Sequence, residues 1–498
     1  MTLRRVLIAN RGEIAVRIIR ACRELAIESV AVFSDADRHA LHTLSADRSV
    51  HIGPAPPAES YLSIPALLDA AQQTGCDAIH PGYGFLSERP EFALACERAG
   101  LVFVGPPARV IELMGSKIAA RGLMESAGVP VVPGKAPADQ SDEGVAAAAR
   151  EVGVPVFVKA SAGGGGKGMR LLRDPAETTS AVQAARREAL AAFGDGTLYV
   201  ERLIERPRHV EIQVCADAHG NVVHLFEREC SLQRRHQKVI EESPSHAITP
   251  SMRARMGDAA VAAARAASYR NAGTIEFLVE GEGDSARFYF LEMNTRLQVE
   301  HPVTEEVTGV DLVRAQLLIA AGAPLPWAQS DLAQRGHAVE CRIYAEDPAN
   351  DFLPQAGPLL LYREPTGPGV RVDSGFAEGD AVAVNYDPLI AKLIASAETR
   401  DGAIDRAIAA LRRFPILGVR TNVRFLIQLL QDQAFRQARV HTGYIDLHLS
   451  GLLTDTDVPI EALAAAAAVE GAPGAASPGA VVRAEDRDPW SVLRGWGR

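Results

Sequence analysis

The order of strand and helix patterns at the start of the chain limits the possible folds more than any other feature. An apolar strand pattern over 5–9 is followed by a turn over 10–12, a helical pattern over 14–25 and a second strand over 29–33. This order predicts a parallel, doubly wound α/β layer. The turn holds one glycine and lacks the G-x-G-x-x-G fingerprint, which argues against a dinucleotide-binding site.

A second unit of this kind follows over 64–104, and changes in composition divide the rest of the chain. We expect an α/β protein, α+β overall: an N-terminal doubly wound parallel-sheet domain, a central domain with a glycine-loop lid, and a mixed α/β C-terminal domain. The end of the chain is rich in Ala, Gly, Pro and acidic residues, so we expect a linker or disordered tail. The expected boundaries are 1–113, 114–325 with the lid over about 131–203, 336–449, and 454–498 for the tail.

Composition excludes several functional classes. The net charge of −10 lacks the basic footprint of a nucleic-acid binder, so we expect no DNA or RNA partner. No apolar stretch approaches the ~20 residues that cross a bilayer, and the first residues do not read as a signal peptide, so we expect a cytoplasmic protein without a membrane partner. The six cysteines are scattered without a C-x-x-C pair, which fits reduced thiols and argues against structural zinc.

Lysine is rare in this chain. Of the 52 basic residues counted as Lys and Arg, six are lysine, so each lysine becomes a candidate for a specific role. For Lys135 and Lys392 we expect the plainer alternative, which is a surface position without a role.

Four consecutive glycines, 163–166, lie between a strand pattern over 154–160 and another over 169–172. Glycine lets the backbone approach an anion closely and point its N–H groups at it, and Lys159 and Lys167 on either side supply positive charge. We expect a phosphate to bind here. The spacing differs from the P-loop motif, and no Ser or Thr follows Lys167. The alternative is a flexible hairpin loop.

Two strand-like runs, 274–280 and 288–294, flank a turn centred on Asp284. If they pair as a hairpin, residues at equal distances from Asp284 face each other, which places Glu276 opposite Glu292. Two adjacent carboxylates repel each other unless a cation lies between them. Mg²⁺, which is held by carboxylates together with nucleotide phosphates, meets that need. The alternative is a pair of solvated acids on an exposed strand face.

Polar and apolar residues alternate over 294–302. In an extended strand Arg296 and Glu300 would lie about 13 Å apart at ~3.3 Å per residue, too far to hold one small anion, so we predict that the chain coils here. A coil could bring a guanidinium and a backbone N–H onto an oxyanion with a carboxylate near its proton. An ordinary amphipathic strand is the alternative.

The segment 230–242 reads as a charged surface loop, but Lys238 argues for a role.

Together these motifs resemble the ATP-grasp superfamily and, within it, the biotin carboxylase subunit of biotin-dependent carboxylases. The similarity covers residues 6–347 and continues more weakly to about 447. Carbamoyl-phosphate synthetases share the glycine loop and the paired acids, but not the HPGYGFLSE and RRHQK strings together. Strings that carry the resemblance include IANRGEIAVRIIRAC, HPGYGFLSE, VKASAGGGGKGM, CSLQRRHQKVIEE and FLEMNTRLQVEHPVTE.

The resemblance implies carboxylation of biotin by bicarbonate, driven by ATP with Mg²⁺ or Mn²⁺ and passing through carboxyphosphate. It assigns Glu300 as the base, Arg342 as the stabiliser of the biotin enolate, and Lys238 and Arg296 as further catalytic residues. It assigns the bicarbonate pocket to Lys238, Arg296, Gln298, Val299 and Glu300, and the metal to Glu276, Glu292 and Asn294. It assigns the nucleotide to Lys117, Lys159, Gly164, Gly165, Gly166, Lys167, Met169, Glu201, Leu203, His209, Gln233 and His236.

The resemblance also implies partners. Longer family members carry a biotinyl lysine near their C-terminus, whereas no lysine follows Lys392 here. Either the chain is a truncated relative or the carrier is encoded separately, and we expect biotin to reach this chain on a separate carrier protein or domain. We also expect a homodimer and a carboxyltransferase subunit, within an acyl-CoA carboxylase of the acetyl- or propionyl-CoA type or a related one. Two departures from the family pattern, Ala162 for a glycine and Lys167 for an arginine, are mild. The alternatives are another ATP-grasp ligase and an inactive nucleotide-binding scaffold.

Overall fold

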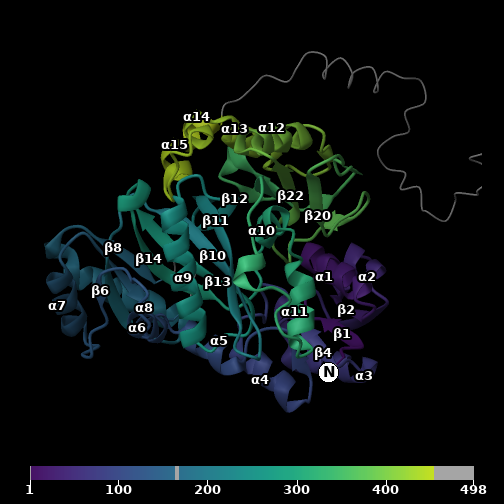
Figure 1. Cartoon of the computed structure of the whole chain (residues 1–498), viewed down its shortest axis with the longest axis horizontal. Coiled ribbons are helices and arrows are strands. Elements are labelled where there is room, and N and C mark those ends of the chain that lie inside the picture. The colour runs from purple at the N-terminus through teal and green to yellow at the C-terminus, as the bar shows by residue number, and fades with distance from the viewer. Residues whose placement is uncertain (1, 163–167, 454–498) are drawn as a thin grey trace, which may run out of the picture. The chain divides into compact units, whose positions relative to one another are not determined.

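The computed structural model describes residues 2–162 and 168–453 (Figure 1), and the residues up to Leu452 form one compact unit. The predicted tail over 454–498 lies outside the described residues, as do Gly164, Gly165, Gly166 and Lys167. Among the described residues, no helix combines the length and apolar character needed to span a bilayer.

The N-terminal part is a five-stranded parallel sheet in the order β3-β2-β1-β4-β5, which confirms the predicted doubly wound layer. Helix α1 begins at Gly12, whose φ of +64° suits glycine at this sharp turn from strand to helix. The elements are β1 Arg5–Ile8, α1 Gly12–Glu24, β2 Glu28–Ser34, α2 Leu41–Ser45, β3 Arg48–Gly53, α3 Ile64–Thr74, β4 Ala78–His80, α4 Pro90–Arg98, β5 Val102–Phe103, α5 Ala108–Gly115 and α6 Lys117–Ser126.

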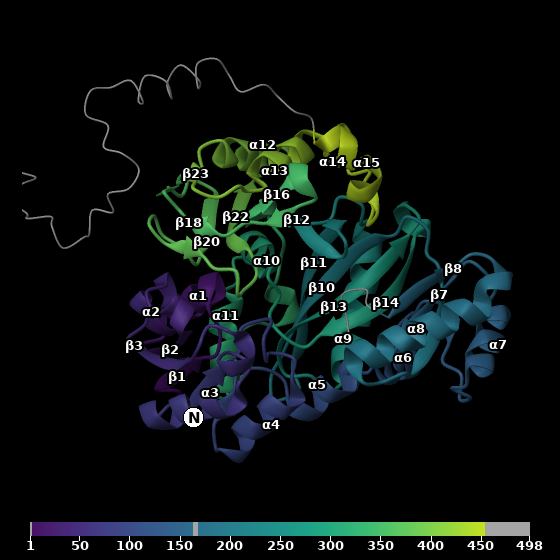
Figure 2. The same ribbon diagram turned by 180° about the vertical axis from the view of Figure 1, so that it is seen from behind.

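The predicted lid is a separate four-stranded sheet in the order β6-β9-β7-β8. Its two helices pack on the sheet (Figure 2). Ala, Val and Leu side chains form the small core between them. Strands β7 and β8 flank the glycine loop, close to the predicted ranges. The elements are β6 Gly134–Lys135, α7 Asp142–Val152, β7 Val156–Ala160, β8 Met169–Leu172, α8 Thr178–Phe193 and β9 Leu198–Arg202.

An eight-stranded antiparallel sheet forms the centre of the molecule, in the order β14-β13-β10-β11-β12-β15-β22-β20. It joins strands from both the central and the C-terminal predicted domains, because β12 pairs directly with β15 at Ile240 and Cys341. The expected domain boundary between residues 325 and 336 does not reveal this continuity. The strands are β10 Arg208–Ala216, β11 Val222–Arg234, β12 Gln237–Ser243, β13 Asn271–Glu280, β14 Arg287–Asn294, β15 His337–Tyr344, β20 Val370–Ser374 and β22 Leu389–Ala397.

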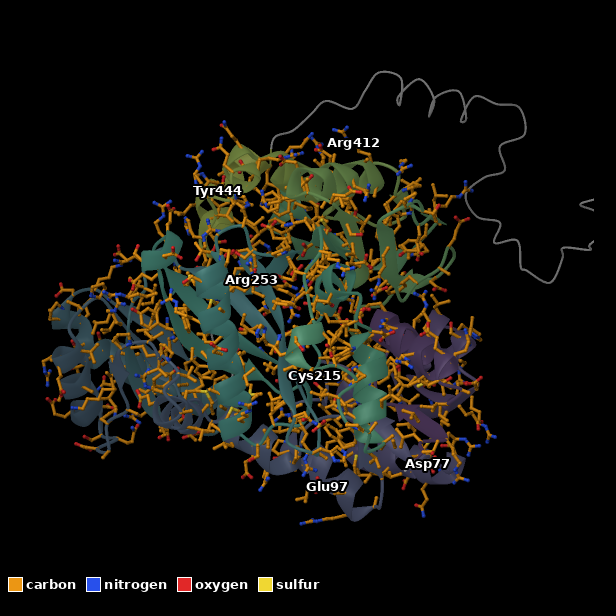
Figure 3. All side chains as sticks on the ribbon, viewed as in Figure 1. Asp77, Glu97, Cys215, Arg253, Arg412 and Tyr444 are labelled. Carbon is orange, nitrogen blue, oxygen red and sulfur yellow. The ribbon has the colours of Figure 1, made fainter. Side chains whose placement is uncertain are left out.

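Helices cover the central sheet and fix its position against the N-terminal part. Helix α9 packs on β10 and β11, and its Arg253, labelled in Figure 3 together with Cys215 of β10, donates to the buried carboxylate of Glu227. Helix α11 lies between α1 and β13. The remaining elements are α9 Pro250–Ala266, α10 His301–Thr308, α11 Leu312–Ala320, β16 Glu346–Asp347, β17 Leu353–Pro354, β18 Gly357–Pro358, β19 Leu361–Tyr362, β21 Ala381–Val382, α12 Arg400–Leu411, β23 Ile416–Leu417, α13 Val423–Gln431, α14 Gln433–Arg436 and α15 Tyr444–Leu452.

Candidate functional site

A cavity of about 990 Å³ lies between the lid, the central sheet and the start of α15. Every predicted site residue within the described part of the chain lines this cavity. The fold therefore brings together residues that are distant in sequence. These residues are Lys117, Lys159, Met169, Glu201, Leu203, His209, Gln233, His236, Lys238, Glu276, Glu292, Asn294, Arg296, Gln298, Val299, Glu300 and Arg342.

The paired acids occupy the predicted register. Glu276 of β13 lies opposite Glu292 of β14, and a bulge just beyond Glu276 shifts the outer half of the hairpin by one residue. Although burial opposes its ionisation, Lys238 and His209 lower the pKa of Glu276. Burial and the charge of Glu276 raise the pKa of Glu292. The hairpin therefore holds Glu276, whose charged form is stabilised, beside Glu292, whose charged form is disfavoured.

These residues fit a divalent cation. Among the described residues, Glu292 has no hydrogen-bond or ion-pair partner, whereas Glu276 accepts from Asn294 Nδ2 at 2.9 Å and from Gln298 Nε2 at 3.2 Å. Carboxylate and amide oxygens are the ligands that Mg²⁺ prefers. A cation beside Glu292 would remove the repulsion that raises the pKa of this acid.

Lys238 of β12 holds three carboxylates at once. Its Nζ donates to Glu211 Oε2 at 2.6 Å, Glu276 Oε1 at 3.0 Å and Glu300 Oε1 at 2.6 Å. Burial alone would lower the pKa of Lys238, but the three acids raise it well above the ordinary value, so the lysine is charged. The sequence analysis predicts Lys238, Glu276 and Glu300 and misses Glu211, which alternates with apolar residues in β10 and looks like an ordinary solvent-facing acid.

Arg342 of β15 joins this cluster from the other side. Its Nη2 donates to Glu300 Oε2 at 3.0 Å and its Nε to Glu241 Oε1 at 2.6 Å. Glu300 is fully buried, which raises its pKa, but Lys238 and Arg342 outweigh burial and lower the pKa well below the ordinary value. Glu300 is therefore an ionised carboxylate held between two cations. Glu241 is a second residue that the sequence analysis misses, and burial raises its pKa to about 7.

The segment after β14 leaves the extended conformation, which confirms the predicted coil. The strand ends at Asn294, and a turn precedes α10. Arg296 Nη1 donates to Gln298 Oε1 at 2.8 Å, and its Nε donates to Glu88 Oε2 at 2.9 Å. Glu88 is the last residue of the HPGYGFLSE string and also accepts from the backbone of Thr295 at 3.1 Å. The N-terminal part therefore fixes the turn that carries Arg296, a role for Glu88 that the sequence analysis misses.

Further basic residues line the cavity beside the lid and next to Glu276. Lys159 of β7 donates to Glu201 Oε2 of β9 at 2.7 Å, and His209 lies 3.2 Å from Glu276 Oε2. Burial lowers the pKa of His209, but Glu276 raises it above the ordinary value. Part of the cavity lining comes from α15 and the residues before it, which no sequence motif predicts. These residues are His441, Thr442, Gly443, Asp446 and Leu447.

The two lysines that we expect on the surface differ. Lys135 is 45% exposed and pairs with Glu151, which confirms its surface position. The expectation for Lys392 is wrong, because its side chain is 0% exposed and ion-paired with Glu13. It belongs to β22, a strand paired on both sides, in which the residues next to Lys392 are buried as well.

Family models match nearly the whole described chain. Residues 2–111 match the N-terminal domain of biotin carboxylase, and residues 340–447 match its C-terminal domain. Residues 116–328 match the ATP-binding domain of the carbamoyl-phosphate synthase L chain.

Curated relatives carry related names. The chain is 52% identical over 446 residues to biotin carboxylase of Halalkalibacterium halodurans, covering 90% of this chain and 98% of the relative. It is 50% identical to a pyruvate carboxylase subunit of Methanothermobacter thermautotrophicus, covering 90% of each. It is 49% identical to the mitochondrial methylcrotonoyl-CoA carboxylase alpha subunit of Rattus norvegicus, of which it spans 63%, with 91% of this chain covered.

Solved structures agree with these relatives. The biotin carboxylase domain dimer of Hydrogenobacter thermophilus 2-oxoglutarate carboxylase, in complex with MgADP, ADP and bicarbonate, matches with a TM-score of 0.87 and 44% identity, covering 92% of this chain and 100% of that one. A β,γ-ATP complex of biotin carboxylase from Campylobacter jejuni matches with a TM-score of 0.86 and 44% identity, covering 90% and 99%. The chain therefore belongs to the biotin carboxylase family, the ATP-dependent ligases of biotin-dependent carboxylases.

Proposed function

We propose that this chain carboxylates biotin with bicarbonate and ATP through carboxyphosphate, acting on biotin attached to a separate carrier. The observation that carries the proposal is the buried cluster in which Lys238 and Arg342 hold Glu300 at the wall of a cavity that also contains the paired acids. A base between two cations, next to a cation-binding pair of acids, suits an anionic substrate that meets a nucleotide phosphate.

The nucleotide and the metal occupy the end of the cavity near the lid. Lys117, Lys159 and His236 supply positive charge for the phosphates, and Glu276, Glu292 and Asn294 hold the metal. A Mg²⁺ or Mn²⁺ ion held by these residues would offset the charge that develops on the transferred phosphoryl group. Closure of the lid sheet that carries β7 and β8 would exclude water, which would hydrolyse carboxyphosphate.

Bicarbonate binds at the turn after β14, between Lys238, Arg296, Gln298 and the backbone of Val299, with Glu300 as the base. A bound anion takes over part of the hydrogen bonding of Lys238, which raises the pKa of Glu300 toward the range in which it accepts a proton. Glu300 takes the bicarbonate proton, and the bicarbonate oxygen forms a bond to the γ-phosphorus. The bond between that phosphorus and the β,γ-bridging oxygen breaks, and ADP leaves.

Biotin binds beside Arg342. Carboxyphosphate gives CO₂ and phosphate, the phosphate takes the proton of the ureido nitrogen, and the nitrogen attacks CO₂. The guanidinium of Arg342 lies next to Glu300 and stabilises the enolate oxygen of biotin in this step. Arg342 is suited to this role because its charge persists at any pH at which the protein is folded.

The complex that we propose is an acyl-CoA carboxylase of the acetyl- or propionyl-CoA type or a related one, with a homodimer of this chain and a carboxyltransferase subunit. Relatives named as methylcrotonoyl-CoA carboxylase subunits support an acyl-CoA acceptor. The pyruvate and 2-oxoglutarate carboxylase relatives support the competing interpretation, a 2-oxo acid acceptor. Copurification from the native cell with a biotinylated partner and a transferase, identified by mass, decides between them.

A test of the reaction uses free biotin. With ATP, Mg²⁺ and bicarbonate, we expect ADP release that depends on both biotin and bicarbonate. A folded preparation in which ADP release depends on neither contradicts the proposal. Dependence on bicarbonate together with a different acceptor, found by screening amines and carboxylates, would instead identify another ATP-grasp ligase.

A further inference from the structure

Lys392 lies behind the turn that carries Glu300, and not at the surface. It occupies β22 between two neighbouring strands, opposite Arg342 of β15 and opposite Asp373 of β20. In an antiparallel sheet, directly opposite residues share a face, so Lys392 continues the row that begins at Arg342. Lys392 itself does not line the cavity described above.

Two carboxylates form ion pairs with the buried ammonium of Lys392, and Glu340 is a third acid close enough to favour its charge. Its Nζ lies 3.2 Å from Glu13 Oε2 and 3.8 Å from Asp373 Oδ2. Glu13 comes from the N-terminal part, and it reaches the lysine because Gly375 lets the chain after β20 approach α1. A Cβ at Gly375 would lie 2.5 Å from the backbone nitrogen of Glu13. A buried ammonium without such partners would lose its charge, so this arrangement keeps Lys392 a cation.

Lys392 donates its hydrogen bond to the turn over 295–300, which carries Arg296 and Glu300 and is called the catalytic turn below. Its Nζ donates to the carbonyl oxygen of Val299 at 2.9 Å, which belongs to the peptide group between Val299 and Glu300. Neighbouring carbonyls are bonded from within the turn, that of Leu297 by Arg296 at 3.2 Å and that of Gln298 by the ring of His301 at 2.8 Å. The third consecutive carbonyl, that of Val299, accepts instead from Lys392 of β22, which lies 93 residues away in sequence.

We propose that Lys392 is a positioning residue that fixes the Val299–Glu300 peptide, and through it the bicarbonate pocket and the base. The inference rests on the proposed function, because it assigns a role within that reaction. Glu13 and Asp373 hold the ammonium, the ammonium holds the carbonyl of Val299, and the carbonyl fixes the backbone from which the Glu300 side chain projects. A displacement of about 1 Å at a reacting group can lower a rate by ~100-fold.

A structural role alone would also make Lys392 necessary, so the test needs a variant in which charge stays balanced. In Lys392→Met combined with Glu13→Gln, the donor and its ion-pair partner are removed together. Asp373 keeps its bonds to Arg371, and burial already raises the pKa of the nearby Glu340 well above its ordinary value. We expect kcat/KM for bicarbonate to fall by about 10- to 100-fold, while KM for ATP and the unfolding temperature stay near the wild-type values. The matched control, Lys135→Met, replaces an exposed lysine and leaves all three unchanged.

The outcomes separate the two proposals. If the wild-type chain lacks ADP release that depends on biotin and bicarbonate, the proposed function fails. If the wild-type chain is active and the charge-balanced variant keeps its kcat/KM for bicarbonate, Lys392 has no positioning role.

A second measurement works on the wild-type chain, so it decides the question even if the variant does not fold. With six lysines, ¹⁵N-lysine labelling gives few ammonium signals. Replacement of the other five lysines by arginine, one at a time, assigns the Lys392 signal by elimination. We expect the Lys392 signal to be protected from exchange with water and to shift when bicarbonate is added. A Lys392 signal that does not respond to bicarbonate, in a chain whose Lys238 signal does, overturns the inference.

Discussion

Two buried lysines on the same sheet have similar surroundings and different access. Lys238 is bonded to Glu211, Glu276 and Glu300 and lines the cavity, whereas Lys392 lies between Glu13 and Asp373 and does not line it. Burial requires carboxylate partners in both places. A buried lysine with acidic partners can therefore take part in chemistry where a cavity reaches it, and serves as a support where protein atoms close it off.

The largest expected effect comes from Lys238→Met. This change leaves three carboxylates facing one another, so we expect the free energy of unfolding to fall by about 3–5 kcal/mol and ADP release to fall by about 100-fold or more. Chemical denaturation and the biotin-dependent assay measure the two effects. The comparison breaks down if the variant keeps its turnover, because Lys238 would then be a support like Lys392.

Glu292→Gln alters the member of the buried acid pair that has no hydrogen-bond or ion-pair partner among the described residues. We expect turnover to be abolished, since the metal loses a carboxylate ligand. We expect the free energy of unfolding to stay the same or rise, because burial and Glu276 already disfavour the charged form of Glu292. Steady-state kinetics and thermal unfolding measure this split. Glu282→Gln, at the exposed turn of the same hairpin, is the control and should change neither quantity.

The smallest effect concerns Glu13, the ion-pair partner of Lys392, and is a change in how steeply the free energy of unfolding depends on pH. Burial raises the pKa of Glu13 to about 7 against an ordinary value of 4.5. The folded chain therefore binds this proton more tightly than the unfolded chain, and its contribution to stability is full below pH 4.5 and is lost as the pH rises to 7. We expect the wild-type free energy of unfolding to decline in this window by up to about 1.4 kcal/mol per pH unit more than that of Glu13→Gln.

The matched control for this slope is Glu242→Gln. His337 and Arg400 outweigh the effect of burial and lower the pKa of Glu242 to about 2. Its contribution is present above pH 4.5 and is lost as the pH falls toward 2, so this variant should keep the wild-type slope between pH 4.5 and 7. Equal slopes for Glu13→Gln and the wild-type chain would show that Glu13 is already ionised in this range.

Local patterns predicted the parts of the site that depend on nearby residues. The turn at Asp284 sets the hairpin register by symmetry, so Glu276 and Glu292 face each other as expected. The bulge beyond Glu276 did not follow from symmetry, because an extra residue on β14, Leu291, breaks the symmetric register. The coil over 295–300 was predictable from reach alone, since two residues that serve one small anion cannot lie on a fully extended strand.

Contacts between distant segments were not predictable in this way. The pairing of β12 with β15 makes one sheet from two predicted domains, and no local pattern encodes that register. Glu211 and Glu241 follow the alternation of ordinary strands, and their partners come from elsewhere in the chain. For Lys392 a signal did exist: a single lysine within the continuous apolar run LIAKLIASA indicates a strand covered on both faces.

The continuity of the central sheet affects how this protein can be dissected. A fragment that stops before His337 would leave the edge of β12 unpaired, with its row of backbone N–H and C=O groups open to other chains. It would also lack Arg342 and the strand that supports the catalytic turn. Such a fragment should aggregate, and any engineered fusion or split of this chain should therefore place its cut outside the segment from β10 to β22.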